Sequence, residues 1–231
     1  MISANDKKCA YGAENTVKAR ENGTIECVRG DETFAAKPAL LLHSCCGPCS
    51  TAVVERLAPR YRIAIFFYNP NISDREEYEK RRAAQVDFVK RYNASTGGFD
   101  AVEYIEGAYE PAVFEAAVRG LEAVPEGGAR CRVCFRLRLE KTTETAVLRG
   151  FDAFSTTLTV SPHKDYETIA RIGREIGLRY RIDYLSEDFK KRDGYRRSVE
   201  LAKRYGLYRQ SGCGCRFADA RRAAAFDHAV P

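Results

Sequence analysis

The chain has 231 residues, of which 45% are hydrophobic and 30% charged, a balance typical of a globular protein that argues against disorder. Its longest apolar runs are too short to span a bilayer and its first residues lack the apolar core of a secretory signal, so we expect a cytoplasmic protein. The formal net charge is +6, and the segment 189–222 holds eleven Lys or Arg against three acids, which leaves the rest slightly acidic.

Residues 1–37 show no clear periodicity, and we interpret them as an N-terminal extension with a small hairpin around Gly30 and Asp31. From residue 38 onward, short apolar strands alternate with amphipathic helices. Strands are predicted at 39–42, 62–67, 101–105, 153–158 and 179–185, and helices at 50–60, 75–92, 111–124, 132–148, 163–176 and 189–205.

This alternation predicts an α/β fold in which a parallel sheet is covered by helices on both faces. We expect one catalytic domain over 38–231, with a basic helical region near its C-terminus. In sheets of this kind a ligand binds at the carboxyl ends of the strands, in the loops that precede the helices.

Nine cysteines are many for a cytosolic chain of this size, and an odd number cannot pair completely in disulfides. Two of them, Cys9 and Cys27, stand alone, and we assign them no role. The other seven fall into three groups: Cys45, Cys46 and Cys49; Cys131 and Cys134; Cys213 and Cys215. In a reducing compartment such groups are more often metal ligands or redox centres than structural bridges.

The first group, in LLLHSCCGPCS, follows a predicted strand and opens a predicted helix, where free backbone N–H groups and the helix dipole stabilise thiolates. Gly47 suits a tight turn at this point and Pro48 suits the start of a helix. In the second group, Cys131 and Cys134 are three residues apart on a first helical turn, so their sulfurs face the same way.

The third group is a C-G-C tripeptide, which is too tight for an ordinary structural zinc knuckle. The flanking Gly212 and Gly214 let the backbone approach a bulky inorganic group. A four-iron cluster needs four thiolates. Three sulfurs would then remain for a second task, such as another metal or a redox dithiol.

Other interpretations remain open at this point. A thioredoxin-like thiol-disulfide oxidoreductase would use Cys46 and Cys49, but Cys45 and the other two groups would then be superfluous. A non-catalytic zinc module that binds RNA is a second alternative. His43 and His163 are interpreted as residues that support metal ligands rather than as ligands.

Long motifs carry a family resemblance. They are LLHSCCGPCS (41–50), FFYNPNI (66–72), EGGARCRVCFRLRLE (126–140), FSTTLTVSPHKD (154–165), EDFKKRDGYRRSVELAKRYGLYRQ (187–210) and CGC (213–215). In these motifs, and over nearly all of Leu40 to Phe217, the chain resembles the QueH family of epoxyqueuosine reductases. The resemblance implies a fold similar to the nucleotide-binding HUP proteins, with cysteines where a phosphate loop would be. A tRNA-thiolating ATP pyrophosphatase would need a loop such as S-G-G-x-D-S at 44–49, and the sequence SCCGPC found there argues against ATP at this position.

The resemblance further implies cobalamin-independent reduction of epoxyqueuosine to queuosine in the anticodon loop of a tRNA. The implied cofactors are a [4Fe–4S] cluster and an adjacent iron ion, and an external electron donor is required. Carried onto this chain, the implied metal ligands are Cys45, Cys46, Cys49, Cys131, Cys134, Cys213 and Cys215.

Removal of an epoxide oxygen as water takes two electrons and two protons, so a proton donor must lie near the leaving oxygen. Candidates in the motif loops are Tyr68, His163, Lys164 and Asp165. Tyr68 is equally well interpreted as a core aromatic residue, and Lys164 as a phosphate ligand.

The basic segment mixes cations with Tyr195, Tyr205 and Tyr208, a combination that suits the phosphates and unstacked bases of an RNA loop. The predicted RNA-binding residues are Lys190, Lys191, Arg192, Arg196, Arg197 and Arg209. The alternative is a solvated helix face. The sequence indicates neither the electron donor nor the oligomeric state.

Overall fold

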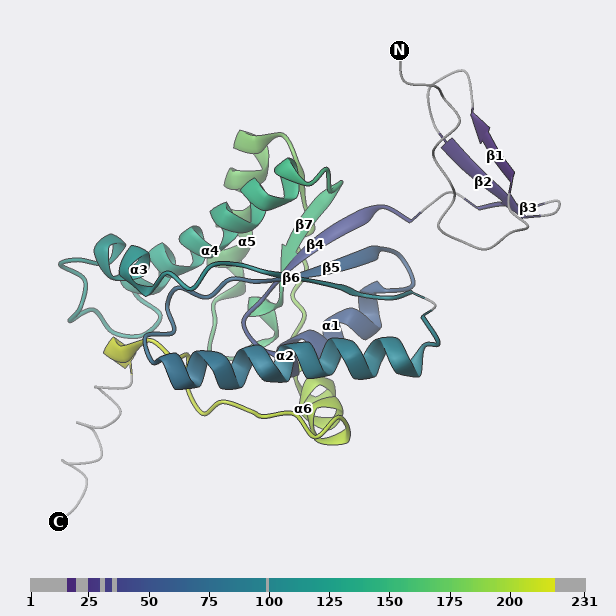
Figure 1. Ribbon diagram of the computed structural model, residues 1–231. Coiled ribbons are helices and arrows are strands. Elements are labelled where there is room, and N and C mark those ends of the chain that lie inside the picture. The colour runs from purple at the N-terminus through teal and green to yellow at the C-terminus, as the bar shows by residue number, and fades with distance from the viewer. Residues whose placement is uncertain (1–15, 20–24, 30–31, 35–36, 99, 219–231) are drawn as a thin grey trace. The chain divides into compact units, whose positions relative to one another are not determined.

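The computed structural model describes residues 16–19, 25–29, 32–34, 37–98 and 100–218 (Figure 1). The chain divides into two compact units, Met1–Lys37 and Pro38–Pro231. In the first unit, β1 (Thr16–Ala19), β2 (Ile25–Arg29) and β3 (Glu32–Phe34) form an antiparallel sheet in the order β1-β2-β3. Arg29 pairs with Glu32, so β2 and β3 flank the predicted hairpin turn, whose two residues lie outside the described ones.

The second unit contains a five-stranded sheet in the order β6-β5-β4-β7-β8, and every strand pair in it is parallel. Its strands are β4 (Ala39–Ser44), β5 (Arg62–Phe67), β6 (Glu103–Glu106), β7 (Ala153–Thr156) and β8 (Asp183–Tyr184). The predicted α/β class with a parallel sheet is confirmed. The chain adds β5 and β6 on one side of β4 and then β7 and β8 on the other, so the strand order reverses next to β4. In open α/β sheets this point, at the carboxyl ends of the strands, is where ligands bind.

Helices cover both faces of this sheet (Figure 1). They are α1 (Gly47–Leu57), α2 (Arg75–Ser95), α3 (Pro111–Ala117), α4 (Ala129–Leu148), α5 (Tyr166–Tyr180) and α6 (Gly194–Arg204), with a short 3₁₀ helix η1 (Thr157–Val160). α1 and α2 lie on one face, with α6 packed against α1, and α4 and α5 lie on the other. The result is a three-layer architecture, as the alternating pattern predicts.

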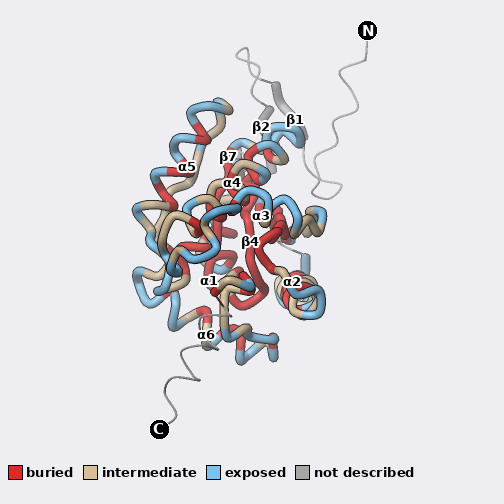
Figure 2. The backbone as a smooth tube through the Cα atoms, turned by 90° about the vertical axis from the view of Figure 1, so that its left-hand side faces the viewer, coloured by how far each residue is buried: buried red, intermediate tan, exposed pale blue. Residues whose placement is uncertain are grey.

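Successive residues of β4 separate the two halves of the core. Leu40 and Leu42 pack with residues of α1 and α2, whereas Leu41 packs with residues of α4 and α5. All three leucines are fully buried, as the central strands are in Figure 2. A strand buried on both faces has a continuous apolar sequence, which is why β4 reads as ALLL rather than as an alternation.

Three predicted elements differ from the observed ones in the middle of the chain. The predicted strand 153–158 ends at Thr156, and Thr157–Val160 form the 3₁₀ helix η1. The predicted helix 111–124 ends at Ala117, and turns occupy the rest of that range. The first two residues of the predicted strand 179–185 are helical, because α5 continues to Tyr180 and ends with Arg181 in the left-handed conformation at φ 55°. Only Asp183 and Tyr184 pair with the sheet.

Helix starts were also placed wrongly. The predicted helix 189–205 begins only at Gly194, because Arg192 and Asp193 before it adopt the left-handed conformation at φ 54° and φ 58°. A Cβ at position 194 would overlap the carbonyl oxygen of Phe189, so glycine permits the turn into α6. The helix predicted from His163 begins at Tyr166, and the preceding Asp165 is its N-cap.

Candidate metal centre

A pocket at the carboxyl ends of the parallel strands is lined by cysteines from all three groups. They are Cys45, Cys131, Cys134, Cys213 and Cys215. These residues come from the end of β4, from the start of α4 and from the loop that follows α6, segments far apart in the sequence. All seven grouped cysteines are free thiols.

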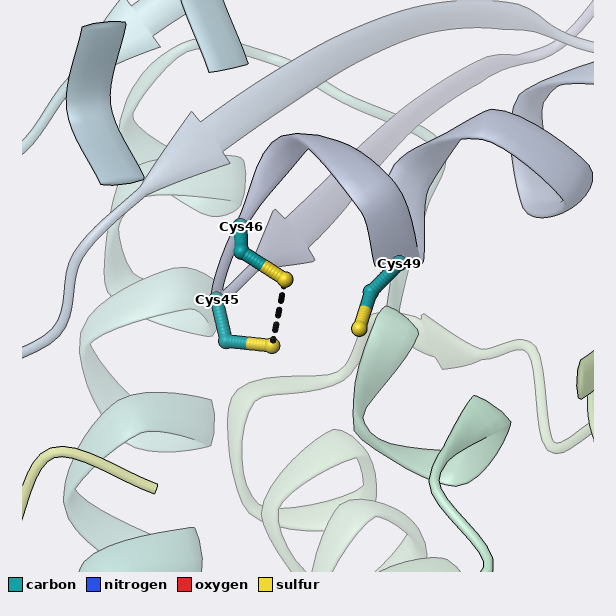
Figure 3. Close-up of side chains that lie close together, drawn as sticks. All are labelled: Cys45, Cys46 and Cys49. Atoms are coloured by element: carbon teal, nitrogen blue, oxygen red, sulfur yellow. Dashed lines mark hydrogen bonds between the residues drawn. The ribbon is translucent and has the colours of Figure 1, made fainter. Parts of the chain in front are cut away.

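The first group occupies the turn between β4 and α1, next to the point where the strand order reverses. The Sγ atoms of Cys45, Cys46 and Cys49 all lie within 4.8 Å of one another, an arrangement that could hold a metal ion (Figure 3). The Sγ atoms of Cys45 and Cys46 are 3.8 Å apart. A dithiol exchange site needs only two sulfurs, so the third favours a metal site over the thioredoxin-like alternative.

Close packing of α1 on α2 fixes this turn. A Cβ on Gly47 would lie 2.5 Å from the carbonyl oxygen of Ala84, so glycine is required for the approach of the two helices rather than for a tight turn. Beside it, the hydroxyl groups of Ser44 and Ser50 both donate to Oε1 of Gln85, at 2.6 Å and 2.8 Å. These buried bonds hold both ends of the cysteine turn against α2.

The three thiols differ in how readily they ionise. Hydrogen bonds from Cys46 and Cys49 hold the pKa of the Cys45 thiol well below its usual value. The hydrogen bond to Cys45 raises the pKa of Cys46 to about 12, and the same cause raises the pKa of Cys49. The turn therefore favours the thiolate form of Cys45 over that of its two neighbours, and a thiolate is the form that binds metal.

The second group lies on the first turns of α4. The backbone N–H of Gly127 donates to Sγ of Cys131 at 3.2 Å, and the side chain of Cys134 is buried. Burial raises the pKa of the Cys134 thiol, and the nearby charge of Arg138 opposes this effect.

The C-G-C loop is held from the side of α2. The guanidinium of Arg81 donates to the carbonyl oxygens of Cys213 and Gly212, at 3.1 Å and 3.2 Å, and Asn71 Nδ2 donates to the same Cys213 carbonyl. A hydrogen bond from Cys215 lowers the pKa of the Cys213 thiol to about 6. The clamp therefore fixes the backbone of a second readily ionised cysteine.

Sequence reasoning missed the buried polar side chains around these thiols. Arg81, Arg130 and Arg138 are buried and line the pocket, and Gln210 donates from Nε2 to Sγ of Cys46 at 3.0 Å. A signal for two of them was present, because Arg130 and Arg138 stand four residues before and after Cys134 and so share its helix face.

The four predicted proton donors differ in their surroundings. His163, Lys164 and Asp165 line the pocket. Asp165 also caps α5, where its Oδ2 accepts from the N–H of Thr168 at 3.1 Å, and this bond lowers its pKa. Tyr68 is not among the lining residues; it is buried, and its hydroxyl donates to Glu110. Burial and this contact raise the pKa of Tyr68.

His43 lies inside the sheet layer. Its Nε2 is 3.0 Å from the carbonyl oxygen of Tyr68, which can only accept, and its Nδ1 is 2.9 Å from Oγ1 of Thr156. Nε2 therefore carries the proton. Burial lowers the pKa of His43 to about 3, so the ring is neutral and links β4 to neighbouring segments.

The predicted RNA-binding residues lie on two parts of the surface. Lys190 and Lys191 line an open depression together with His163, Lys164 and Asp165, which also belong to the cysteine pocket. The others continue along the chain: Arg192, Arg196, Arg197 and the exposed Arg209. The first part of the basic segment thus lies in a depression that shares three residues with the cysteine pocket.

Acidic residues accompany the arginines of α6. Arg197 binds Glu55 of α1 through two bonds of 2.7 Å and 2.9 Å, and Arg196 binds Asp193 at 3.0 Å. In the part of the chain that the structure describes, no ion pair reaches the side chain of Lys191 or of Arg192. Lys191 nevertheless shares its depression with Glu167 and Asp188, and Arg192 lines a second depression together with Glu55 and Glu200.

Among the described residues, no helix combines the length and the apolar character that crossing a membrane requires.

Comparison with known proteins agrees with the resemblance in the motifs. Residues 40–221 match the family described as epoxyqueuosine reductase QueH. The chain is 46% identical over 187 residues to the epoxyqueuosine reductase QueH of Streptococcus pyogenes serotype M1, covering 81% of this chain and 72% of that protein. It is 43% identical to the Staphylococcus epidermidis protein of the same name, with 84% and 82% covered, and 37% identical to that of Thermotoga maritima, with 77% and 88% covered. The chain belongs to the epoxyqueuosine reductase QueH family.

Proposed function

We propose that this protein is a tRNA epoxyqueuosine reductase, which removes the epoxide oxygen of epoxyqueuosine with two electrons and two protons to give the alkene of queuosine and one water. The observation that carries the proposal is the pocket of free thiols at the switch point of the sheet, in a chain of this family. The tRNA substrate places the reaction in the cytoplasm, and an external donor supplies the electrons.

The residues of the pocket suit an iron–sulfur cofactor. Seven thiols are available, and a [4Fe–4S] cluster takes four, so three remain for an additional iron ion. Buried guanidinium groups around the thiols suit an anionic metal–thiolate group. We propose that all three cysteine groups contribute ligands to these two sites. When bound, the cluster supplies electrons one at a time and the additional iron acts as a Lewis acid.

The chain itself must hold the substrate and move protons. We propose His163 and Lys164 as the first candidates for the donor that protonates the leaving oxygen, because both line the pocket and lie at its rim. Asp165 and Tyr68 are weaker candidates, since the first caps a helix and the second is engaged with Glu110. A donor is recognised by a substitution that keeps the full iron content and abolishes turnover.

The RNA face is proposed to start at the same rim. Lys190 and Lys191 lie beside His163 and Lys164, so cations that hold phosphates would flank the pocket that receives the modified base. Arg192, Arg196, Arg197 and Arg209 extend this basic surface.

The test is anaerobic purification with iron and sulfide counting, followed by assay on tRNA that carries epoxyqueuosine. We expect conversion to queuosine without added cobalamin and more than four irons per chain. tRNA that lacks the modification is the control for non-specific electron consumption. Zinc in place of iron, or no conversion by a fully loaded protein, would contradict the proposal. Full activity with four irons would contradict the additional iron alone.

A further inference from the structure

Two arginines of α4 lie one helical turn before and one turn after Cys134. Arg130 and Arg138 are only 1% and 3% exposed, and both belong to the buried face of the helix that carries this cysteine. Both also line the cysteine pocket. Their guanidinium groups are therefore positive charges within the pocket wall rather than on the surface.

Neither charge is neutralised by a carboxylate within the described part of the chain. Arg138 donates from Nε to the carbonyl oxygen of Cys134 at 3.2 Å. Arg130 donates from Nη1 to three backbone carbonyls of the loop 121–124, and its Nε and Nη2 have no hydrogen-bond partner. The third buried arginine, Arg81, differs because it forms an ion pair with Glu77 at 2.7 Å.

A buried charge is costly unless an opposite charge accompanies it. The charge of Arg138 acts on the thiols beside it and lowers the pKa of both Cys45 and Cys134. Glu126 and Asp165 also line the pocket, and Asp165 is engaged as the N-cap of α5. The positive charge of Arg138 in the pocket wall can therefore offset the negative charge of thiolates, or of an anionic group that the cysteines bind.

We propose that Arg138 is a positioning residue for the metal centre, where its unneutralised buried charge offsets the negative charge of the metal-bound thiolates and raises the reduction potential. The inference rests on the proposed iron–sulfur function. An added electron makes the centre more negative, so a nearby cation stabilises the reduced form, and net charge is one of the factors that set cluster potentials. Arg130 has a second role in holding the loop 121–124, which makes Arg138 the cleaner position to test.

The experiment compares three variants in the full chain after anaerobic iron loading. Arg138→Met removes the charge and keeps a long apolar side chain, whereas Arg138→Lys keeps the charge. Arg136→Met is the control on the same helix, because Arg136 is partly exposed and forms its ion pair with Glu175. The ratio of reduced to oxidised cluster is followed by electron paramagnetic resonance during a redox titration.

We expect Arg138→Met to lower this ratio at least tenfold at a fixed ambient potential, a shift of 59 mV for a one-electron couple. Arg138→Lys and Arg136→Met should stay close to the wild type. A wild-type potential in Arg138→Met would overturn the inference.

If Arg138→Met retains no iron, its reduction potential cannot be titrated. The denaturation midpoint of the metal-free, reduced protein is then measured instead. Removal of an uncompensated buried charge should leave its denaturation midpoint unchanged or raise it. A lowered midpoint would show an ordinary structural role and would overturn the inference. The proposed function fails separately, if the wild type takes up no iron; an active wild type beside an unshifted Arg138→Met refutes only the role of Arg138.

Discussion

Arg130 and Arg138 in the wall of the cysteine pocket differ from Arg196 and Arg197 on α6 in whether an acid accompanies the arginine. On α6, Arg196 is exposed and Arg197 is partly exposed, and both are bound to acids. In the pocket wall, Arg130 and Arg138 are buried and form no ion pair among the described residues.

This difference shows what a count of charges along a sequence can miss. The segment 189–222 stands out in the sequence because it is rich in cations, yet part of that charge is balanced by neighbours in space, including Glu55 from α1. The arginines of α4 do not stand out because they are surrounded by other charged residues. Their burial beside thiols gives them the stronger electrostatic effect on the site.

The largest expected effect on iron content and turnover comes from removing the thiol of Cys134, which lies beside the buried Arg138. Cys134→Ser should lower both iron content and turnover by more than about 100-fold, since even residues that only support ligands cost 10- to 100-fold. Cys27→Ser is the control, because Cys27 belongs to none of the three groups. Iron determination and the tRNA assay measure both effects, and a Cys134→Ser protein with full iron and turnover would remove Cys134 from the ligand set.

Arg81 and Arg82 are neighbours on α2 and differ in burial. Substituting each of them tests whether burial determines how much an arginine contributes to the stability of the protein. Arg81→Met removes the ion pair with Glu77 and the two bonds to the C-G-C loop, so the free energy of unfolding should fall by about 2–4 kcal/mol. Arg82→Met removes only exposed ion pairs and should cost less than about 1 kcal/mol. Denaturant unfolding of both variants measures the difference. An equal fall in the free energy of unfolding would show that burial does not determine how much these arginines stabilise the protein.

His43 extends the comparison to pH. Its pKa is lowered from 6.5 to about 3 in the folded protein, so the unfolded chain binds a proton first as the pH falls. The neutral ring of His43 therefore contributes its full stabilisation of the folded protein above pH 6.5. This stabilisation is lost progressively as the pH falls from 6.5 to about 3. Between pH 7 and pH 5 the free energy of unfolding should fall by about 2 kcal/mol from this residue.

The matched variants are His43→Gln, which cannot titrate, and His163→Gln at the exposed histidine. Unfolding curves at the two pH values should show a smaller loss for His43→Gln than for the wild type, and an unchanged loss for His163→Gln. The same pH dependence in His43→Gln and wild type would mean that the buried ring does not govern acid stability.

The sheet could be predicted from sequence because its strands are short apolar runs between amphipathic helices. β5 was predicted at 62–67, as observed, since every residue after Arg62 is apolar and buried. The errors fall where side-chain contacts in space decide an end. α6 begins at Gly194, where only glycine fits against the carbonyl oxygen of Phe189 and where the left-handed Arg192 and Asp193 interrupt the predicted helix. Arg181 ends α5 through the same left-handed conformation, which residues other than glycine rarely adopt.

The site was partly predictable for a related reason. Cysteines can be identified in a sequence by their spacing, and a strand followed by a helix places Cys45 at the edge of the sheet. The clamp of Arg81 on Cys213 joins residues 132 positions apart, so no local pattern could indicate it. Whether an arginine lies beside an acid or beside a thiol also depends on burial, and the spacing of residues in the sequence does not determine burial.

The smallest expected effect concerns the surface cations themselves. In tRNA binding, each phosphate contact contributes about 0.7 to 0.9 to the slope of log affinity against log salt concentration. Lys191→Gln with Arg192→Gln removes two cations that no described acid pairs, so the slope should fall by about 1.4 or more. Arg196→Gln with Arg197→Gln should also weaken binding, but with a smaller change in slope, because Glu55, Asp193 and Glu200 already neutralise part of that charge.

Binding measured at several salt concentrations separates the two pairs, with Arg179→Gln on the exposed side of α5 as the control outside the basic segment. Equal changes for both pairs would show that the acids beside α6 release their arginines to the RNA. The difference between buried and surface arginines would then lie in their exposure alone, because RNA phosphates can displace carboxylates only where both are in contact with water.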